Sequence, residues 1–260
     1  MDWRMLMNHR EILIRTEKLC KSFSQGKNQE HILKNLDVLI YKNDFTVIMG
    51  VSGSGKTTLL YMLSGMDKPS LGKVTFNEED IAQYNQNKLA LFRRNNCGFV
   101  FQQINLIDSM SVMDNIVACG LLKEKDKRKV LIRSREILTS VGITSQNWSK
   151  FPIQLSGGEA QRVGVARAAI NNPEIIFADE PTGALNSKAG KAVLDLLSAI
   201  HINGQSIIMV THDIHAALRG NRVIYLKDGL ICGECSLGLY NPGDMERKGK
   251  LESFLTDMEW

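Results

Sequence analysis

Short apolar runs recur along the chain, and between them apolar residues return every three or four positions. Residues 45–49, 175–178, 206–211 and 222–226 form such runs, and most of their apolar side chains are β-branched or aromatic. Runs of this length are typical of buried strands, whereas a spacing of three to four residues is typical of helices with one apolar face. The alternation predicts an α/β fold in which helices cover both faces of a largely parallel sheet.

Three regions depart from this pattern. Residues 12–18, 32–41 and 73–77 alternate between apolar and polar positions, which predicts half-buried antiparallel strands near the N-terminus. A mostly helical insertion is predicted over about residues 104–160, with helices at 112–122 and 127–141, the second of which ends at Gly142. The tail, residues 233–260, is expected to form a loop and a short helix at 245–255.

Composition narrows the class of protein. The chain has 260 residues and a net charge of +4 at pH 7, with both signs interspersed, so no dedicated nucleic-acid surface is indicated. Its five cysteines are scattered, as is typical of reduced thiols, and although Cys232 and Cys235 have metal-ligand spacing, there is no second pair. We expect no membrane span, which needs roughly 20 apolar residues, and no cleaved signal peptide.

A glycine-rich segment follows the apolar run at residues 45–49. It reads Gly50-Val-Ser-Gly-Ser-Gly55-Lys56-Thr57 and leads into a helical pattern at residues 56–63. This order of strand, loop and helix is that of a P-loop, whose backbone N–H groups surround a phosphate at the positive end of a helix. Lys56 is expected to bridge the β- and γ-phosphates, and the Thr57 hydroxyl to bind magnesium. The expected nucleotide-binding residues of this segment are Gly50, Ser52, Gly53, Ser54, Gly55, Lys56, Thr57 and Thr58.

Two acidic residues, Asp179 and Glu180, follow the apolar run at residues 175–178. Because nucleotides bind at the carboxyl ends of strands in such sheets, both carboxylates are candidates for catalysis. Asp179 is expected to hold magnesium, directly or through water, and Glu180 to polarise the attacking water. A solvated acidic turn is the alternative interpretation, and the P-loop elsewhere in the chain favours catalysis.

A third segment, Leu155-Ser-Gly-Gly-Glu159, precedes a helical pattern at residues 160–170. Ser156 and Glu159 have the spacing of a capping box, and a helix that starts with Ser-Gly-Gly is an exposed anion site. Taken alone, the segment also fits a well-capped surface helix. Its occurrence between the P-loop and the acidic pair narrows the class of P-loop protein.

With these three segments in this order, residues 11–232 resemble the ABC ATPase family. The resemblance implies a single domain with a P-loop NTPase (RecA-like) core and parallel sheet, an antiparallel β subdomain and a helical signature subdomain. It implies hydrolysis of ATP with Mg²⁺ in a head-to-tail homodimer. The signature residues of one subunit, Ser156, Gly157 and Gly158, would bind the γ-phosphate of ATP held by the P-loop of the other.

Other positions match the family residue by residue. Phe23 corresponds to the aromatic residue that stacks on adenine, although a core Phe is an alternative interpretation. Gln102 corresponds to the glutamine that contacts magnesium and links the site to the membrane partner, with Gln103 as a neighbouring alternative. His212 corresponds to the switch histidine at the γ-phosphate, so the expected catalytic residues are Glu180, His212 and Lys56.

Asn186 departs from the family pattern, in which Asp is usual at this position. Asparagine still caps the helix that follows, but it removes a negative charge from the expected dimer interface. The departure concerns the coupling between the two sites and the rate of turnover, not the binding of ATP.

Residues 65–69, 91–94, 98–106 and 180–185 resemble a branch of the family that includes macrolide-efflux, lipoprotein-release and cell-division cassettes, and within it bacterial antimicrobial-peptide transporters. This implies a peripheral protein on the cytoplasmic face of the cell membrane that energises a permease for peptide export or resistance. The permease would dock between Gln102 and Asn115. The alternative is a regulatory ATPase of a non-transport membrane complex, of the cell-division type.

ABC proteins of DNA repair or translation are a more distant alternative. They would require a coiled coil or zinc insertion between Lys56 and Ser156, or a second cassette, and the sequence has neither. No nucleic-acid partner is therefore expected.

Overall fold

The computed structural model describes residues 11–25 and 28–260 and divides the chain into two compact units. Unit 1 is Met1–Leu89 with Val210–Trp260, and unit 2 is Ala90–Met209. Unit 2 contains the expected helical insertion, and it also includes strands β7 (Cys97–Val100) and β8 (Ile175–Asp179) and helix α7 (Ser187–Ile202). Among the described residues, no helix combines the length and apolar character that crossing a membrane requires.

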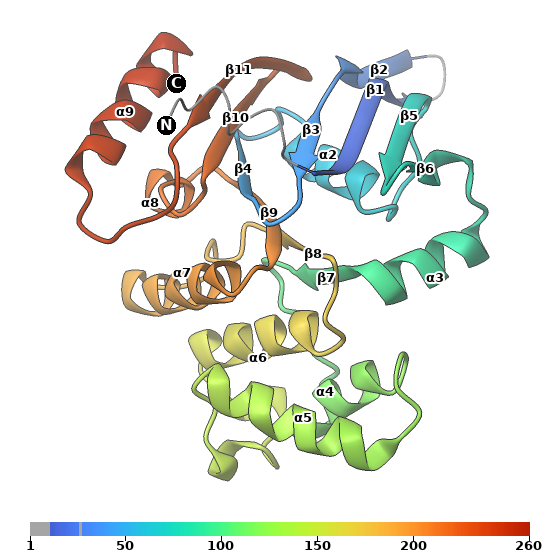
Figure 1. Cartoon of the computed structure of the whole chain (residues 1–260), viewed down its shortest axis with the longest axis vertical. Coiled ribbons are helices and arrows are strands. Elements are labelled where there is room, and N and C mark those ends of the chain that lie inside the picture. The colour runs from blue at the N-terminus through green and yellow to red at the C-terminus, as the bar shows by residue number, and fades with distance from the viewer. Residues whose placement is uncertain (1–10, 26–27) are drawn as a thin grey trace. The chain divides into compact units, whose positions relative to one another are not determined.

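Unit 1 contains the antiparallel sheet predicted for the N-terminal part of the chain. Its strands are β1 (Ile12–Gln25), β2 (Asn28–Leu36), β3 (Leu39–Tyr41), β5 (Leu71–Phe76) and β6 (Glu79–Asp80). The order is β2-β1-β5-β6, with β3 also paired to β1, and Figure 1 shows β1, β2 and β5 side by side. The 3₁₀ helix η1 (Ile81–Gln83) follows β6.

The prediction of a single strand at residues 32–41 is wrong, because the structure has two strands there. β2 ends at Leu36, and β3 begins at Leu39. At the break, the Thr16 hydroxyl donates to the Leu36 carbonyl at 2.8 Å and accepts from the Val38 N–H at 2.8 Å. The interruption depends on a side chain of β1, which a local alternation of apolar and polar residues does not reveal.

A second group of strands in unit 1 positions the P-loop. β4 (Phe45–Met49) is parallel to β10 (Arg222–Lys227), which pairs antiparallel with β11 (Leu230–Ser236). All residues of β4 are buried, as predicted for a strand covered on both faces. Helix α2 (Lys56–Leu63) begins at the end of the P-loop, so the predicted order of strand, loop and helix is confirmed. Strand β9 (Ser206–Thr211) contains the boundary between the two units, and α8 (Ile214–Ala217) follows it.

The C-terminal tail has the predicted loop and helix, with α9 running from Met245 to Asp257. Arg247 anchors this helix and is itself buried. Its guanidinium donates to the carbonyls of Leu218 at 2.7 Å and Leu237 at 2.8 Å, and to three further carbonyls nearby. Burial lowers the pKa of Arg247. The Arg247 side chain thus connects α9 both to the segment that follows α8 and to the loop that precedes α9.

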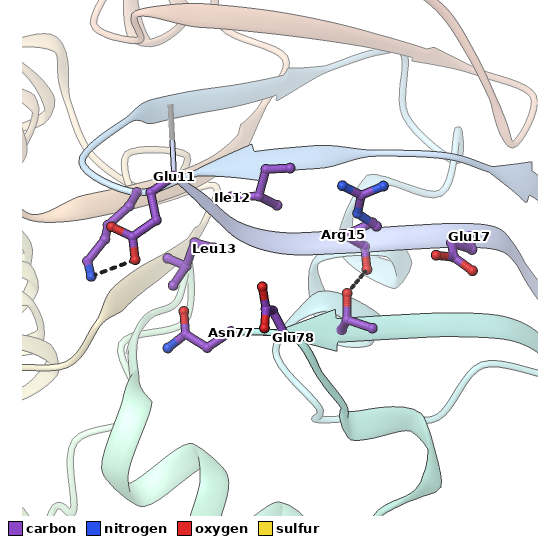
Figure 2. Close-up of a pocket in the computed structure, with 9 residues that line it drawn as sticks. Glu11, Ile12, Leu13, Arg15, Glu17, Asn77 and Glu78 are labelled. Atoms are coloured by element: carbon purple, nitrogen blue, oxygen red, sulfur yellow. Dashed lines mark hydrogen bonds and ion pairs between the residues drawn. The ribbon is translucent and has the colours of Figure 1, made fainter. Parts of the chain in front are cut away.

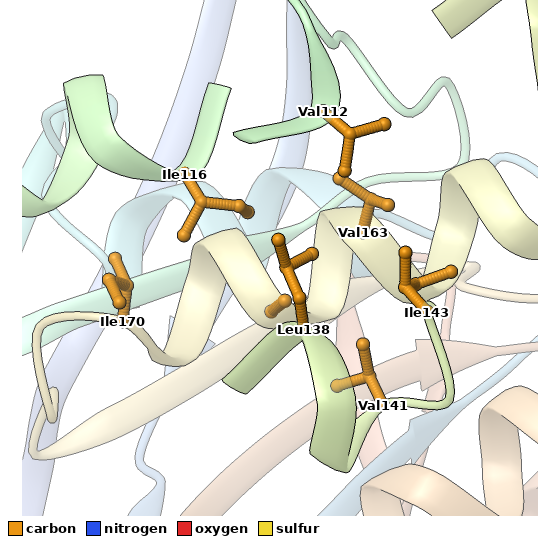
Figure 3. Packing of buried hydrophobic residues seen from close by; sticks show 8 residues of the cluster. Val112, Ile116, Leu138, Val141, Ile143, Val163 and Ile170 are labelled. Carbon is orange, nitrogen blue, oxygen red and sulfur yellow. The ribbon is translucent and has the colours of Figure 1, made fainter. Parts of the chain in front are cut away.

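Unit 2 contains the parallel pair β7 and β8 and a helical layer. Its helices are α4 (Val112–Gly120), α5 (Lys127–Ser140), α6 (Gly157–Ala169) and α7, with 3₁₀ helices η2 (Ser145–Asn147) and η3 (Pro152–Gln154). The helices predicted at 112–122 and 127–141 are confirmed within two residues of their ends. Figure 3 shows the apolar side chains that hold this layer together: Val112, Ile116, Leu138, Val141, Ile143, Val163, Ala166 and Ile170.

Helix α3 (Gln86–Asn96) is not among the elements that the hydrophobic pattern predicts. Leu89 and Phe92 are its buried apolar residues, whereas Leu91 is exposed. With so few apolar positions facing the interior, the helical period is too weak to recognise from the sequence.

Candidate functional site

The P-loop presents backbone N–H groups at the start of α2. Gly55 is the N-cap of this helix in a left-handed conformation, with φ of 101°, and no side chain caps the first turn. The first turn also has no acidic residue. Its N–H groups and the positive end of the helix dipole are therefore available to an anion. Ser52, Gly53 and Thr57 are exposed around this helix start.

Lys56 folds back across the P-loop. Its ammonium donates to the carbonyls of Gly50 and Val51, both at 2.9 Å. The residue is 8% exposed, so its charge is held close to the loop that is expected to receive phosphate. A nucleotide phosphate would accept hydrogen bonds that these carbonyls accept here.

Close backbone packing restricts one position of the loop, and a buried hydroxyl distinguishes another. A Cβ at Gly50 would lie 2.1 Å from the Leu226 carbonyl oxygen, so only glycine allows β4 and β10 to approach so closely. The Ser54 hydroxyl is buried without a hydrogen-bond partner. A buried polar group of this kind usually has a partner, and a nucleotide would supply acceptors beside it.

Unit 1 also holds Phe23 and His212. Phe23 lies on β1 and is 46% exposed, so it is not the core Phe of the alternative interpretation. His212 is exposed and directly follows β9. The next residue, Asp213, accepts a hydrogen bond from the His215 N–H at 2.8 Å and caps α8. The histidine therefore lies between a buried strand and a capped helix start, both of which restrict its backbone.

In unit 2, the signature segment starts helix α6. Ser156 is the N-cap, and its hydroxyl accepts from the Glu159 N–H at 3.3 Å while the Glu159 carboxylate accepts from the Ser156 N–H at 2.9 Å. This confirms the predicted capping box. Hydrogen bonds from Ser156 lower the pKa of Glu159, so the carboxylate remains ionised. A Cβ at Gly158 would lie 2.9 Å from that of Ala189, which explains the small residue there.

Asp179 ends β8, and Glu180 follows it in a left-handed conformation, with φ of 43°. A side chain other than glycine is uncommon in this region, and such strained residues concentrate at functional sites. The Gly183 N–H donates to the Glu180 carbonyl at 3.0 Å and closes a turn. The backbone thus sets the direction in which the Glu180 carboxylate leaves the strand.

Gln161 is an important residue that the sequence interpretation missed. It is 1% exposed, and its side-chain amide donates to the carbonyls of Phe101 at 3.0 Å and Pro181 at 2.8 Å. These carbonyls precede Gln102 and follow Glu180, so one side chain of α6 holds two of the expected site segments. The sequence signal is a polar residue on a helix face that is otherwise apolar.

Unit 2 brings Gln102 close to the turn after Glu180. A Cβ at Gly183 would lie 2.8 Å from the side-chain nitrogen of Gln102, so glycine leaves room for that side chain. Gln103 is also exposed, and the geometry favours Gln102 because it is the glutamine placed beside Gly183.

The segment between Gln102 and Asn115, expected to dock a permease, is a loop that leads into α4. Ile107 is 48% exposed, whereas Asn115 is buried, with 3% exposed. The Asn115 side chain accepts from the Ile107 N–H at 2.8 Å and donates to the Ile107 carbonyl at 3.2 Å. Asn115 therefore stabilises the loop through hydrogen bonds from a buried position and is not one of its surface residues.

Oxygen donors are the expected ligands of magnesium. Thr57, Gln102 and Asp179 offer a hydroxyl, an amide carbonyl and a carboxylate, which are the hard ligands that Mg²⁺ prefers. Within residues 11–25 and 28–260, no three His, Cys, Asp or Glu side chains gather as a metal cage.

A separate hollow of about 590 Å³ lies on the antiparallel sheet of unit 1 (Figure 2). Its lining includes the carboxylates of Glu11, Glu17 and Glu78 and the cations of Arg15 and Lys42. Lys42 pairs with Glu11 at 3.1 Å. With more carboxylates than cations, this hollow is unsuited to a nucleotide phosphate, and none of the expected site residues lines it.

Cys232 and Cys235 both lie on β11. Cys232 is exposed and Cys235 is buried. Among the described residues, neither cysteine belongs to a group of three or more His, Cys, Asp or Glu side chains that could hold a metal ion.

Comparison with known proteins identifies the family. The ABC transporter family model matches residues 33–183, which include the P-loop, the signature segment and the acidic pair. The ABC transporter ATP-binding protein MJ1508 of Methanocaldococcus jannaschii is 40% identical over 219 residues, covering 84% of this chain and 97% of that protein. The macrolide export ATP-binding/permease protein MacB of Mannheimia succiniciproducens is 39% identical over 219 residues, covering 84% of this chain and 34% of that protein. This chain thus spans about a third of the length of that macrolide export relative.

A solved structure gives the same result for the fold. The dimeric ATP-binding cassette MJ0796, in a post-hydrolysis state bound to ADP and Pi, has a TM-score of 0.81 and 37% sequence identity, covering 86% of this chain and 99% of that chain. The expected α/β fold class is confirmed. From these similarities and the motifs that carry them, the chain belongs to the ABC transporter family and is one of its ATPases.

Proposed function

We propose that this ATPase energises a membrane permease that exports or confers resistance to antimicrobial peptides, acting as a homodimer on the cytoplasmic face of the cell membrane. The main support for a permease partner is that this chain matches ATP-binding/permease proteins over about a third of their length. In the proposed assembly, a permease chain contacts the exposed part of the loop between Gln102 and Asn115. The peptide substrate rests on the family resemblance of residues 65–69, 91–94, 98–106 and 180–185.

The nucleotide chemistry that we propose assigns a role to each site residue. Backbone N–H groups of Gly53, Gly55 and Lys56 bind the phosphates, with Lys56 exchanging the carbonyls of Gly50 and Val51 for phosphate oxygens. Phe23 stacks on adenine. Further phosphate contacts come from Ser52, Ser54, Thr57 and Thr58.

The remaining residues act at the γ-phosphate. Glu180 accepts a proton from the attacking water, and His212 contacts the γ-phosphate. Thr57, Gln102 and Asp179 would hold Mg²⁺, which neutralises phosphate charge when it is bound. In the proposed homodimer, the start of α6 with Ser156, Gly157 and Gly158 presents N–H groups to the γ-phosphate bound by the other subunit.

Expression together with candidate permeases tests the proposed function. Cells that produce this chain with the membrane protein encoded beside it should survive higher concentrations of cationic antimicrobial peptides than cells that produce either protein alone. The same pair with Glu180→Gln should give no protection, because protection depends on hydrolysis. Unchanged peptide sensitivity with the active pair would contradict the peptide-transport role.

The same cells test the alternative function. A regulatory ATPase of the cell-division type would change cell length or septum formation without changing peptide sensitivity. Protection against macrolides but not peptides would keep the ATPase and permease roles and replace the substrate.

Asn186 provides a separate prediction about turnover. Its side-chain oxygen caps α7 by accepting from the Ala189 N–H at 2.9 Å, and Asp caps a helix equally well. Asn186→Asp therefore keeps the cap and adds one negative charge at an exposed position. Turnover, or its cooperativity in ATP, is expected to change by up to about fivefold, the size of one exposed charge interaction.

Steady-state ATPase assays of Asn186→Asp and Asn186→Ser measure this effect. Ser retains a capping oxygen without the charge and should behave as the native chain does. Identical kinetics in all three proteins would show that the charge at residue 186 has no role in turnover.

A further inference from the structure

Lys21 on β1 is a buried cation beside the ring that we assign to adenine. The residue is 9% exposed, and its ammonium lies 5.0 Å from the centre of the Phe23 ring. Lys21 and Phe23 are two positions apart on one strand, so their side chains leave the same face. Because a buried ammonium is costly unless it is paired, its partners indicate what it does.

Two partners that follow the P-loop helix hold the ammonium. The Asp67 carboxylate lies 2.6 Å away, and the Lys68 carbonyl accepts a hydrogen bond at 2.8 Å. The Asp67 N–H in turn donates to the carbonyl of Tyr61, in the last turn of α2, at 3.2 Å. Lys21 is therefore connected through Asp67 to the last turn of the helix whose start is proposed to bind phosphate.

Backbone contacts strengthen the same connection. The Ser70 N–H donates to the Cys20 carbonyl at 2.9 Å, and the Ser22 N–H donates to the Ser70 hydroxyl at 3.0 Å. The residues on both sides of Lys21 are thus bound to the segment after α2. These contacts hold the backbone of β1 on both sides of Lys21 to the segment that supplies the partners of its ammonium.

We propose that Lys21 is a positioning residue for the adenine base of ATP. Its ammonium attracts one face of the Phe23 ring, which is 46% exposed as a residue, and in this proposal the other face receives the base. A cation within about 6 Å of a ring centre gives a favourable contact that is stronger where water is excluded. Through Asp67 and Lys68, this contact holds the adenine-binding ring in register with the P-loop helix. The inference rests on the proposed adenine-stacking role of Phe23.

The test compares two ligands on the full chain with Mg²⁺, namely ATP and inorganic tripolyphosphate, which lacks the base. Lys21→Met keeps an apolar side chain of similar length and removes the charge. It is expected to weaken ATP binding about fivefold, the range of one partly desolvated cation–π contact, and to leave tripolyphosphate binding unchanged. KM for ATP should rise with little change in kcat. Lys21→Arg, which also places a cation over a ring, should restore most of the ATP affinity.

A matched control comes from a second cation–π pair of unit 1. Lys88 lies 4.6 Å from the centre of the Tyr84 ring, and neither residue belongs to the proposed nucleotide site. Lys88→Met should bind both ligands as the native chain does. Asp67→Asn leaves Lys21 in place and removes its charged partner, so it should weaken ATP binding about twofold. This variant tests the proposal if Lys21→Met does not fold.

Phe23→Leu separates failure of this inference from failure of the adenine-stacking role. If Phe23→Leu binds ATP normally, Phe23 does not stack on adenine. If Phe23→Leu weakens ATP binding while Lys21→Met does not, the stacking role stands and the role of Lys21 is overturned. Equal losses of ATP and tripolyphosphate affinity in Lys21→Met would also overturn it, because they would indicate a general change in the P-loop. In the Phe23→Leu background, Lys21→Met should cause no further loss.

Discussion

Glu180→Gln is expected to lower kcat for ATP hydrolysis by about 10²-fold to 10⁴-fold, the contribution of one general base, while ATP still binds. Glutamine has nearly the same shape as glutamate, and neither residue is favoured at the φ of 43° that the backbone adopts there. The turn closed by the Gly183 N–H and the contact of Gln161 with the Pro181 carbonyl do not involve the residue 180 side chain. The substitution therefore removes the basicity of residue 180 and leaves these two backbone contacts in place.

Blocked hydrolysis should also lengthen the life of the ATP-bound dimer. Size-exclusion chromatography of Glu180→Gln with ATP and Mg²⁺ is expected to show dimer, whereas the native chain returns to monomer as ATP is consumed. Glu174→Gln is the matched control, because Glu174 is exposed just before the opposite end of β8. Normal turnover in Glu180→Gln, with monomer as the only species in ATP, would remove Glu180 from catalysis.

The parts of the site that the sequence predicts are those built from neighbouring residues. The P-loop, the Ser156 capping box and the Asn186 cap each join residues at most a few positions apart, so spacing alone reveals them. The fold class follows in the same way, because strand and helix periods are local. The apolar runs predicted β4 and β8 because burial on both faces requires such runs.

The parts that the sequence does not predict depend on distant backbone groups. Gln161 binds carbonyls 60 and 20 residues away, and Arg247 binds carbonyls near residues 218 and 237. Every residue has a backbone carbonyl, so the sequence does not reveal which carbonyls Gln161 and Arg247 bind. The division of residues 32–41 into two strands has the same origin, since it depends on Thr16.

Ser156→Arg is expected to abolish ATPase activity in the homodimer while the chain still binds ATP. The P-loop residues that are proposed to hold the phosphates belong to unit 1, and Ser156 belongs to unit 2, where it caps α6. Loss of the cap costs about 1 kcal/mol, which by itself does not stop catalysis. Asp126→Arg controls for this cost, because Asp126 caps α5 of the same unit by accepting from the Arg128 N–H at 2.9 Å. It should lose similar stability and keep its ATPase activity.

Mixing two inactive variants tests whether the signature acts on the other subunit. Lys56→Ala should fail to bind phosphate, since it removes the ammonium that lies across the P-loop. In a head-to-tail dimer of Ser156→Arg with Lys56→Ala, one site combines the intact P-loop of the first chain with the intact signature of the second. A one-to-one mixture should therefore recover up to about a quarter of the native activity, because about half of the dimers are mixed and each has one complete site. A mixture no more active than its two components would mean that a single chain supplies both segments to one ATP.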